Sequence, residues 1–226
     1  MSEIITLTAA HDGFQFTALH AAPQGERKGG VIVIQEIFGL DRYVHEDVAR
    51  WSALGFEVIA PSMFDRHEKG FTAEHDPAGF ENGVKYAMAN GPENAMGDLQ
   101  ACINFLAERG PVFMVGYCYG GTMTWLAASR LKGLSAGSSY YGSQVGGMAK
   151  FDLSCPVIVH LGRKDGHIPA DEVKAAVEAA HPEVPVYIYE ASGHGFNNDG
   201  RPDSDPADAA LARERTLALF QANGAA

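Results

Sequence analysis

The chain has 226 residues, of which 46% are hydrophobic and 20% charged, and its formal net charge is −11. This length and composition suit a single α/β domain over residues 1–226 and exclude disordered, coiled-coil and membrane-spanning classes. The negative charge disfavours nucleic acid and anionic membranes as partners, because both attract basic patches. The first residues lack the basic and apolar regions of a secretory signal, so we expect a cytoplasmic protein.

Apolar β-branched runs alternate along the chain with segments that carry apolar residues at helical spacing. An opening hairpin is expected at 4–7 and 14–19. Further strands are expected at 31–35, 57–60, 112–117, 136–141, 157–161 and 186–189, and helices at 43–54, 92–109, 122–131, 170–180 and 207–222. The alternation predicts a mostly parallel sheet with helices on both faces. Residues 64–91 have the least regular pattern and are expected to supply loops and a short helix over the functional site.

A cysteine at the centre of a G-x-C-x-G pattern is the most informative feature of the chain. Cys118 lies between the apolar run 112–115 and a helical pattern, with Gly116, Gly120 and Gly121 around it. This layout predicts a nucleophile elbow, a sharp turn that presents one side chain above the strand ends. A helix N-terminus also favours the thiolate. Within this glycine frame we interpret Cys118 as a nucleophile rather than as an inert buried thiol.

The spacing of cysteines and histidines predicts neither a disulfide framework nor a metal site. Cys102, Cys118 and Cys155 are widely separated and form no C-x-x-C pair, and the nine histidines include no H-E-x-x-H motif. We therefore expect no metal and no cofactor.

A cysteine nucleophile needs a general base and a group that orients the base. Asp165 follows the strand expected at 157–161, and His194 follows the strand expected at 186–189. The carboxyl ends of parallel strands lie along one edge of a sheet, so both side chains can converge on Cys118. Nucleophile, acid and histidine in this chain order are typical of the α/β-hydrolase fold. His167 is the next candidate for the base.

With these residues the chain resembles the dienelactone hydrolase family, a cysteine branch of the α/β-hydrolases. The resemblance spans nearly the whole chain. It implies that Cys118 is the nucleophile, His194 the general base and then acid, and Asp165 the residue that orients His194. It also implies that the backbone N–H groups of Ile37 and Tyr119 form the oxyanion hole. The segments that carry the resemblance to this family are Q-E-I-F-G at 35–39, G-Y-C-Y-G-G at 116–121, Y-Y-G at 140–142, the Asp165 loop at 165–169 and G-H-G-F at 193–196.

Glu36 is not required by the triad itself. It closely follows the aliphatic run 31–34, so we expect it to be partly buried, where desolvation raises the pKa of a carboxyl group unless donors surround it. One interpretation is a structural carboxylate that fixes the loop. In the family the matching glutamate meets the cysteine thiol in the resting enzyme, and such a contact limits oxidation and alkylation. The resemblance therefore implies that Glu36 is a catalytic-site residue.

The chain departs from the family prototype where substrate charge is recognised. The prototype binds a dienelactone carboxylate with two arginines, one of them four residues after the catalytic histidine, where this chain has Asn198. The second arginine should fall within 80–86, where Lys85 is the sole cation. Arg66 and Arg201 are close enough in sequence to substitute, but nothing in the sequence fixes their direction.

The residues expected around the substrate are mostly aromatic. An apolar pocket with few charges suits neutral esters or lactones better than an anionic diene. The expected pocket consists of Phe38, Phe64, Arg66, Tyr86, Tyr140, Phe196 and Asn198.

The sequence thus predicts a cofactor-independent hydrolase that opens small-molecule esters or lactones through a thioester on Cys118. Two alternatives stay open. An amidotransferase-like cysteine enzyme would pair its histidine with a glutamate two residues later, where this chain has Phe196. A redox-sensing or ligand-binding protein would keep the hydrolase frame with an unused site.

Overall fold

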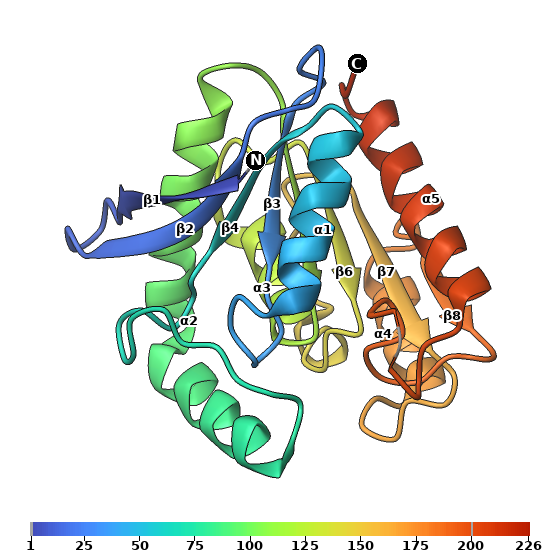
Figure 1. Cartoon of the computed structure of the whole chain (residues 1–226). Helices are drawn as coiled ribbons and strands as arrows, with labels where there is room; N and C mark the ends of the chain where they lie inside the picture. Colours follow the sequence, from blue (N-terminus) through green and yellow to red (C-terminus); the bar gives the residue numbers. More distant parts are fainter. Residues whose placement is uncertain (1, 200) are drawn as a thin grey trace.

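Eight strands form one sheet in the order β1-β2-β4-β3-β5-β6-β7-β8 in the computed structural model, which describes residues 2–199 and 201–226 (Figure 1). The two strands β1 and β2 form the expected hairpin, and β2 is antiparallel to β4. Every pair from β4 to β8 is parallel, which confirms the predicted mostly parallel sheet. The strands are β1 (Ser2–Thr8), β2 (Gln15–Ala21), β3 (Gly30–Ile34), β4 (Glu57–Pro61), β5 (Val112–Tyr117), β6 (Ala136–Tyr140), β7 (Val157–Gly162) and β8 (Val186–Tyr189).

Helices cover both faces of this sheet (Figure 1). One face carries α1 (Arg42–Ala53) and α5 (Pro206–Ala222), which meet through Trp51 and Phe220 with ring centroids 5.3 Å apart. The other face carries α2, α3 and α4. Their bounds are α2 (Pro77–Ala107), α3 (Tyr119–Arg130) and α4 (Ala170–Ala180), and a short 3-10 turn, η1 (Gly146–Met148), lies against α4.

The core lies on both sides of the central strands. All residues of β3 and β5 are buried, as their unbroken apolar runs predict for strands covered by helices on both faces. Towards α5, Phe113 stacks on Phe220 at 4.6 Å between ring centroids. Each such side chain contributes roughly 1.5–3 kcal/mol on burial. No helix within the described residues is long and apolar enough to cross a bilayer.

The segment expected to be irregular contains a long helical section, so that expectation is corrected here. Helix α2 begins at Pro77, where the Asp76 carboxylate accepts a hydrogen bond from the Gly79 N–H at 2.7 Å, and it bends at Gly91, whose φ is 64°. Glycines weaken a helical pattern in a sequence. In the structure a Cβ at Gly83 would overlap the carbonyl oxygen of Ile37. Gly83, one of the glycines that weaken the helical pattern in the sequence, therefore allows α2 to pack directly on the backbone after β3.

A buried polar cluster joins β6, β7 and β8 to α5. The fully buried His160 contacts the Tyr189 hydroxyl through Nδ1 at 2.8 Å and the Thr216 hydroxyl through Nε2 at 3.2 Å. Thr216 also contacts the hydroxyls of Ser138 and Tyr140. Burial, with a contribution from the nearby charge of Arg215, lowers the pKa of His160 from 6.5 to about 3. The imidazole is therefore neutral in the folded protein.

We predict that His160 makes the protein sensitive to acid. Between pH 6.5 and about 3 the unfolded chain binds a proton at this position that the folded chain does not. The free energy of unfolding should therefore fall with decreasing pH in this window, by up to about 1.4 kcal/mol per pH unit from this group. Denaturant titrations at several pH values should give a flatter dependence for His160→Gln. The exposed His45 supplies the control: His45→Gln should keep the wild-type slope. An unchanged slope in His160→Gln would contradict this assignment.

Candidate active site

Cys118 occupies a strained turn between β5 and α3. Its φ of 53° lies in the left-handed region, which is uncommon for residues other than glycine. The turn is possible because the surrounding glycines have no Cβ. A Cβ at Gly116 would overlap the carbonyl oxygen of Gly120, and one at Gly120 would overlap that of Ile34. The strand, the left-handed residue and the helix follow one another as in a nucleophile elbow.

The three cysteines differ sharply in their surroundings. Cys118 is partly exposed and caps the N-terminus of α3, where the helix dipole favours a thiolate. Cys102 is buried, and burial raises the pKa of its thiol well above the usual range. Burial also raises the pKa of Cys155, to about 11. The position of Cys118 is therefore the one that suits a reactive thiolate at neutral pH.

His194 and Asp165 form a short hydrogen bond near this turn. The His194 Nδ1 lies 2.7 Å from Asp165 Oδ2, and the other carboxylate oxygen accepts the backbone N–H groups of His167 at 2.8 Å and Ile168 at 3.2 Å. Burial alone would raise the pKa of Asp165, but the hydrogen bond from His194 and the neighbouring charges and donors lower it. Asp165 is thus held as a carboxylate in a fixed orientation.

The pKa of His194 reflects two opposing effects. Burial favours the neutral imidazole, but hydrogen bonds to Asp165 and Cys118, together with their negative charges, raise the pKa of His194 from 6.5 to about 10. Asp165, His194 and Cys118 therefore interact as one group of side chains, and the imidazolium form is favoured at neutral pH.

Two backbone N–H groups beside Cys118 are available to bind an oxygen. Within residues 2–199 and 201–226 neither the Ile37 amide nor the Tyr119 amide donates to another protein group. The next amide, of Gly120, donates to the carbonyl oxygen of Gln35 at 3.1 Å and so joins the loop after β3 to the start of α3. This contact keeps the two free amides on neighbouring segments, as an oxyanion hole requires.

Glu36 contacts the segment that follows His194. Its carboxylate accepts the Asn198 amide at 3.2 Å and forms an ion pair with Arg201 at 3.0 Å. No hydrogen bond joins Glu36 to Cys118 within the described part of the chain. The thiol contact implied by the family resemblance is therefore not present in this arrangement, and Glu36 fixes the loop that carries His194.

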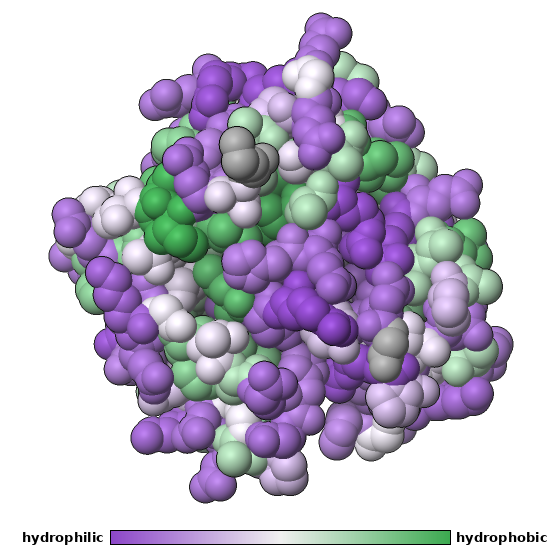
Figure 2. All heavy atoms as spheres, viewed as in Figure 1, coloured by the Kyte–Doolittle hydropathy of each residue, from purple (hydrophilic) through white to green (hydrophobic). Residues whose placement is uncertain are grey.

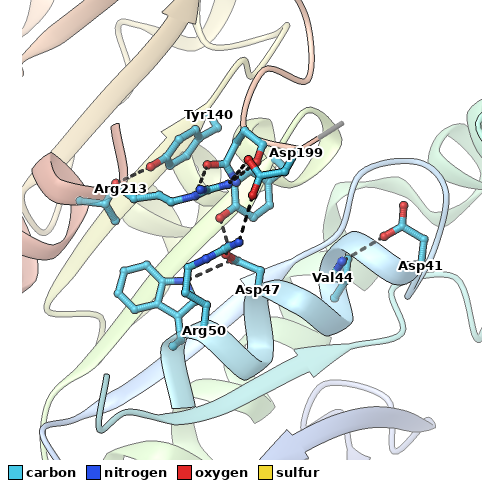
Figure 3. A network of polar contacts seen from close by, with 11 residues as sticks. Asp41, Val44, Asp47, Arg50, Tyr140, Asp199 and Arg213 are labelled. Atoms are coloured by element: carbon cyan, nitrogen blue, oxygen red, sulfur yellow. Dashed lines mark hydrogen bonds and ion pairs between the residues drawn. The ribbon is translucent and has the colours of Figure 1, made fainter. Parts of the chain in front are cut away.

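An ionic network ties the same loop to α1 and α5 (Figure 3). Arg213 of α5 donates through Nε to Asn197 Oδ1 at 3.0 Å and lies 3.2 Å from Asp199. Arg50 of α1 reaches Asp199 from the other side and pairs with the buried Asp47 at 2.6 Å. The Tyr117 hydroxyl, next to Cys118 in sequence, donates to the same Asp47 carboxylate at 2.7 Å. The turn that bears Cys118 and the loop that bears His194 are thus connected through charged side chains.

Hydrophilic side chains dominate the outer surface of this face. Figure 2 presents the molecule from the side of α1 and α5, and most of the visible surface is hydrophilic, with hydrophobic residues in separate patches.

Comparisons with known proteins agree with this geometry. Residues 16–224 match the sequence profile described as the dienelactone hydrolase family. The chain belongs to this family. It is 30% identical to carboxymethylenebutenolidase of Pseudomonas putida over 218 residues, 92% of each chain. It is 28% identical to the putative carboxymethylenebutenolidase of Escherichia coli K12, over 94% of this chain and 84% of that protein.

The fold agrees with a solved structure of the same kind. The putative dienelactone hydrolase from Klebsiella pneumoniae subsp. pneumoniae MGH 78578 has a TM-score of 0.83 and 26% identity, over 98% of this chain and 99% of that one. The predicted α/β-hydrolase fold and the assignment as a hydrolase are thereby confirmed. The amidotransferase and sensor alternatives gain no support from these relatives.

The residues expected in the pocket do not all lie together. Phe38 stacks on His75 at 3.8 Å between ring centroids, and Phe64 lies 5.3 Å from the ring of Tyr119. Tyr86 packs against Phe71. Phe38 and Tyr86 lie at the boundary between the loop after β3 and the first half of α2 and remain candidates for a substrate pocket, whereas Phe64 is fully buried and belongs to the core.

Three other expected pocket residues are also placed differently. Tyr140 and Phe196 are fully buried in the core, where the Tyr140 hydroxyl contacts Thr216, because the end of β6 is covered by α5. Arg66 forms ion pairs with Asp12 at 2.5 Å and with the buried Asp98 at 2.7 Å, so its guanidinium is already occupied by carboxylates of the protein. The attraction of these two carboxylates fixes the direction of the Arg66 side chain, which the sequence did not determine.

Sequence reasoning missed Asp47, Arg50, Asp199 and Arg213 altogether. Their role depends on contacts between α1, α5 and the loop after β8. An aspartate on the buried face of α1 was the one available signal, because a buried carboxylate requires partners.

We predict that Asp165 maintains the high pKa of His194. Asp165→Asn removes the charge and the best hydrogen-bond acceptor, so the pKa of His194 should move from about 10 towards 6.5. An NMR titration of the His194 Cε1 proton measures this directly. Because the folded-state pKa is raised, His194 contributes stability that is complete below pH 6.5 and is lost as the pH rises through about 10. Asp171→Asn, at an exposed carboxylate of α4, is the matched control and should leave the titration unchanged. A wild-type titration in Asp165→Asn would refute the role.

Proposed function

We propose that this dienelactone hydrolase-like hydrolase opens neutral esters or lactones through a covalent thioester on Cys118. The observation that carries the proposal is the strained, partly exposed Cys118 at the head of α3, beside the hydrogen-bonded pair of His194 and Asp165. A nucleophile, a base and an oriented acid are the three groups that acyl transfer by a cysteine requires.

In the first half of the reaction the Cys118 thiolate attacks the ester carbonyl carbon. The carbonyl oxygen becomes an oxyanion and accepts hydrogen bonds from the N–H groups of Ile37 and Tyr119, which have no other acceptor within the described residues. The carbon–oxygen bond to the leaving group then breaks. The departing alkoxide takes the proton of the His194 imidazolium, whose raised pKa of about 10 supports its presence at neutral pH.

In the second half a water molecule hydrolyses the thioester. Neutral His194 accepts one proton from the water as its oxygen attacks the acyl carbon. Collapse of the second tetrahedral intermediate breaks the carbon–sulfur bond, releases the carboxylic acid and restores the thiolate and imidazolium. Asp165 holds the imidazole in place in both halves through its 2.7 Å hydrogen bond to Nδ1.

Glu36 belongs to this site in the proposal because it fixes the segment after His194. Its partners Asn198 and Arg201 lie four and seven residues after the histidine, and removal of the carboxylate would leave both without their acceptor. Its negative charge near the nucleophile also opposes a second negative charge, so Glu36 limits the reactivity of the resting thiolate.

The proposed preference for neutral substrates rests on how the nearby arginines are used. The guanidinium of Arg66 is occupied by Asp12 and Asp98, and that of Arg201 by Glu36. A substrate carboxylate would have to compete with these ion pairs or lose its hydration among apolar side chains. A neutral ester avoids both costs.

We predict that Cys118 is the single cysteine required for turnover. Cys118→Ala should abolish the hydrolysis of an activated aryl ester such as 4-nitrophenyl acetate, while Cys155→Ala, at a cysteine whose thiol stays protonated, should keep most of it. His194→Ala should reduce kcat by at least about a hundredfold, the lower range for the loss of a positioned general base. Full activity in Cys118→Ala would end this proposal, and a small effect of His194→Ala would transfer the base to His167.

We predict that neutral aryl esters and unsubstituted lactones have a higher kcat/KM than dienelactone. The comparison needs both substrates on the wild-type enzyme and on Arg201→Gln, which removes the cation that pairs with Glu36. Arg201→Gln should leave the order of the two substrates unchanged. The proposed preference is wrong if the wild-type enzyme prefers dienelactone. If that preference then falls by roughly tenfold or more in Arg201→Gln, the size of one lost charge-assisted hydrogen bond, Arg201 binds the substrate carboxylate.

A further inference from the structure

Tyr141 is a buried residue with two unfavourable features. It follows β6 directly, is 0% exposed, and has a φ of 38°, in the left-handed region that aromatic residues avoid. Its hydroxyl has no hydrogen-bond partner within residues 2–199 and 201–226. The adjacent Tyr140 is equally buried, but its hydroxyl contacts Thr216 at 2.8 Å. The unpaired hydroxyl is therefore specific to Tyr141 and does not come from burial of this segment in general.

Unpaired buried donors and left-handed aromatic residues both cost free energy and are concentrated at functional sites. Tyr141 lies at such a position. The backbone N–H of Cys118 donates to the carbonyl oxygen of Tyr140 at 3.0 Å, and the ring of Tyr141 lies 5.0 Å from that of His194. The segment that bears Tyr141 is therefore attached directly to the nucleophile turn.

The groups whose charges act on the Tyr141 hydroxyl include the Glu36 carboxylate and the Cys118 sulfur. The two Glu36 oxygens bind Asn198 and Arg201. Solvent does not reach the buried hydroxyl. The Cys118 sulfur can move towards this hydroxyl by rotation about a single side-chain bond.

We propose that the Tyr141 hydroxyl donates a hydrogen bond to the Cys118 sulfur when that sulfur is a thiolate, and so makes the thiolate easier to form. This inference rests on the proposed role of Cys118 as nucleophile. Burial, the negative charge of Glu36 and the neighbouring Tyr117 raise the pKa of Tyr141 well above the usual range, so the phenol keeps its proton and acts as a donor. A donor aimed at an anion stabilises the anion relative to its protonated form.

Charged groups face this pair of residues from neighbouring elements. The imidazole of His194, after β8, interacts with the sulfur of Cys118, and Arg201, after β8, and Glu36, after β3, act on the Tyr141 hydroxyl. Tyr117 of β5 directs its hydroxyl to Asp47 and is not available. Tyr141 is thus a neutral donor among charged residues. The substitution Tyr141→Phe removes only its hydroxyl oxygen, so the effect of this donor on Cys118 can be measured without changing any charge.

The test is the pH dependence of iodoacetamide labelling at Cys118, quantified on the Cys118 peptide by mass spectrometry. In Tyr141→Phe the midpoint of the curve of labelling rate against pH should move upwards by about one pH unit, the size expected for one hydrogen bond to a charged group. The midpoint of thermal unfolding should stay unchanged or rise, because an unpaired buried hydroxyl is removed.

Tyr189→Phe is the matched control. Its hydroxyl is also buried but bonds to His160 at 2.8 Å and Arg215 at 3.1 Å. This variant should lower the midpoint of thermal unfolding by about 2–4 °C or more and leave the labelling curve unchanged.

The outcomes separate this inference from the proposed hydrolase mechanism. An unchanged labelling curve in Tyr141→Phe overturns the inference. If ester turnover in that variant is nevertheless slower, the phenol contacts the ester rather than the sulfur. Labelling requires no ester turnover. Failure of the wild-type enzyme to hydrolyse any aryl ester would therefore refute the proposed substrate class while leaving the labelling result valid.

Discussion

The close approach of backbone to backbone at the nucleophile turn is the constraint on which the site depends. Cys118 can adopt a left-handed conformation only because its glycine neighbours let the start of α3 lie against β3 and against the end of β6. A single Cβ at Gly120 or Gly121 would overlap a carbonyl oxygen of those strands. The same proximity joins the loop that bears Ile37 to the start of α3 through the hydrogen bond from Gly120 to Gln35. Sterics at the turn, rather than any strong attraction, thus set the position of Cys118, the nucleophile in our proposal.

Electrostatic contacts then fix the second half of the site. The loop after β8 has little regular structure, yet each of its functional side chains has a charged or polar partner on another element: His194 on Asp165, Asn198 on Glu36, and Asp199 on Arg213. Because several of these contacts are partly buried, they gain more from charge than exposed ion pairs would. These side-chain partners on other elements act together with the loop's own backbone hydrogen bonds, such as those from Gly193 to Asp203 at 3.1 Å and from Asn198 to Gly195 at 3.0 Å.

Four arginines around the site are paired with carboxylates of the protein itself. Arg201 neutralises Glu36, Arg213 and Arg50 neutralise Asp199 and Asp47, and Arg66 is paired with Asp12 and Asp98. The chain as a whole carries a net charge of −11, so its carboxylates outnumber its cations. The proposed preference for neutral esters follows from this balance of charge as much as from the aromatic side chains.

The sequence by itself determined the features that depend on neighbours along the chain. The bounds of β5, β8 and α4 agree with the predicted ranges, and the positions of Cys118, Asp165 and His194 after β5, β7 and β8 follow from the alternation of strands and helices. Tertiary structure decided the rest. Gly83, in the first half of α2, is explained by its contact with the Ile37 carbonyl, and the direction of Arg66 is explained by its ion pairs with Asp12 and Asp98. The partner of Glu36 lies 162 residues away, at Asn198. Periodicity and turn patterns report local preferences, whereas the pairing of charges and the close packing of backbone depend on which segments the fold brings together.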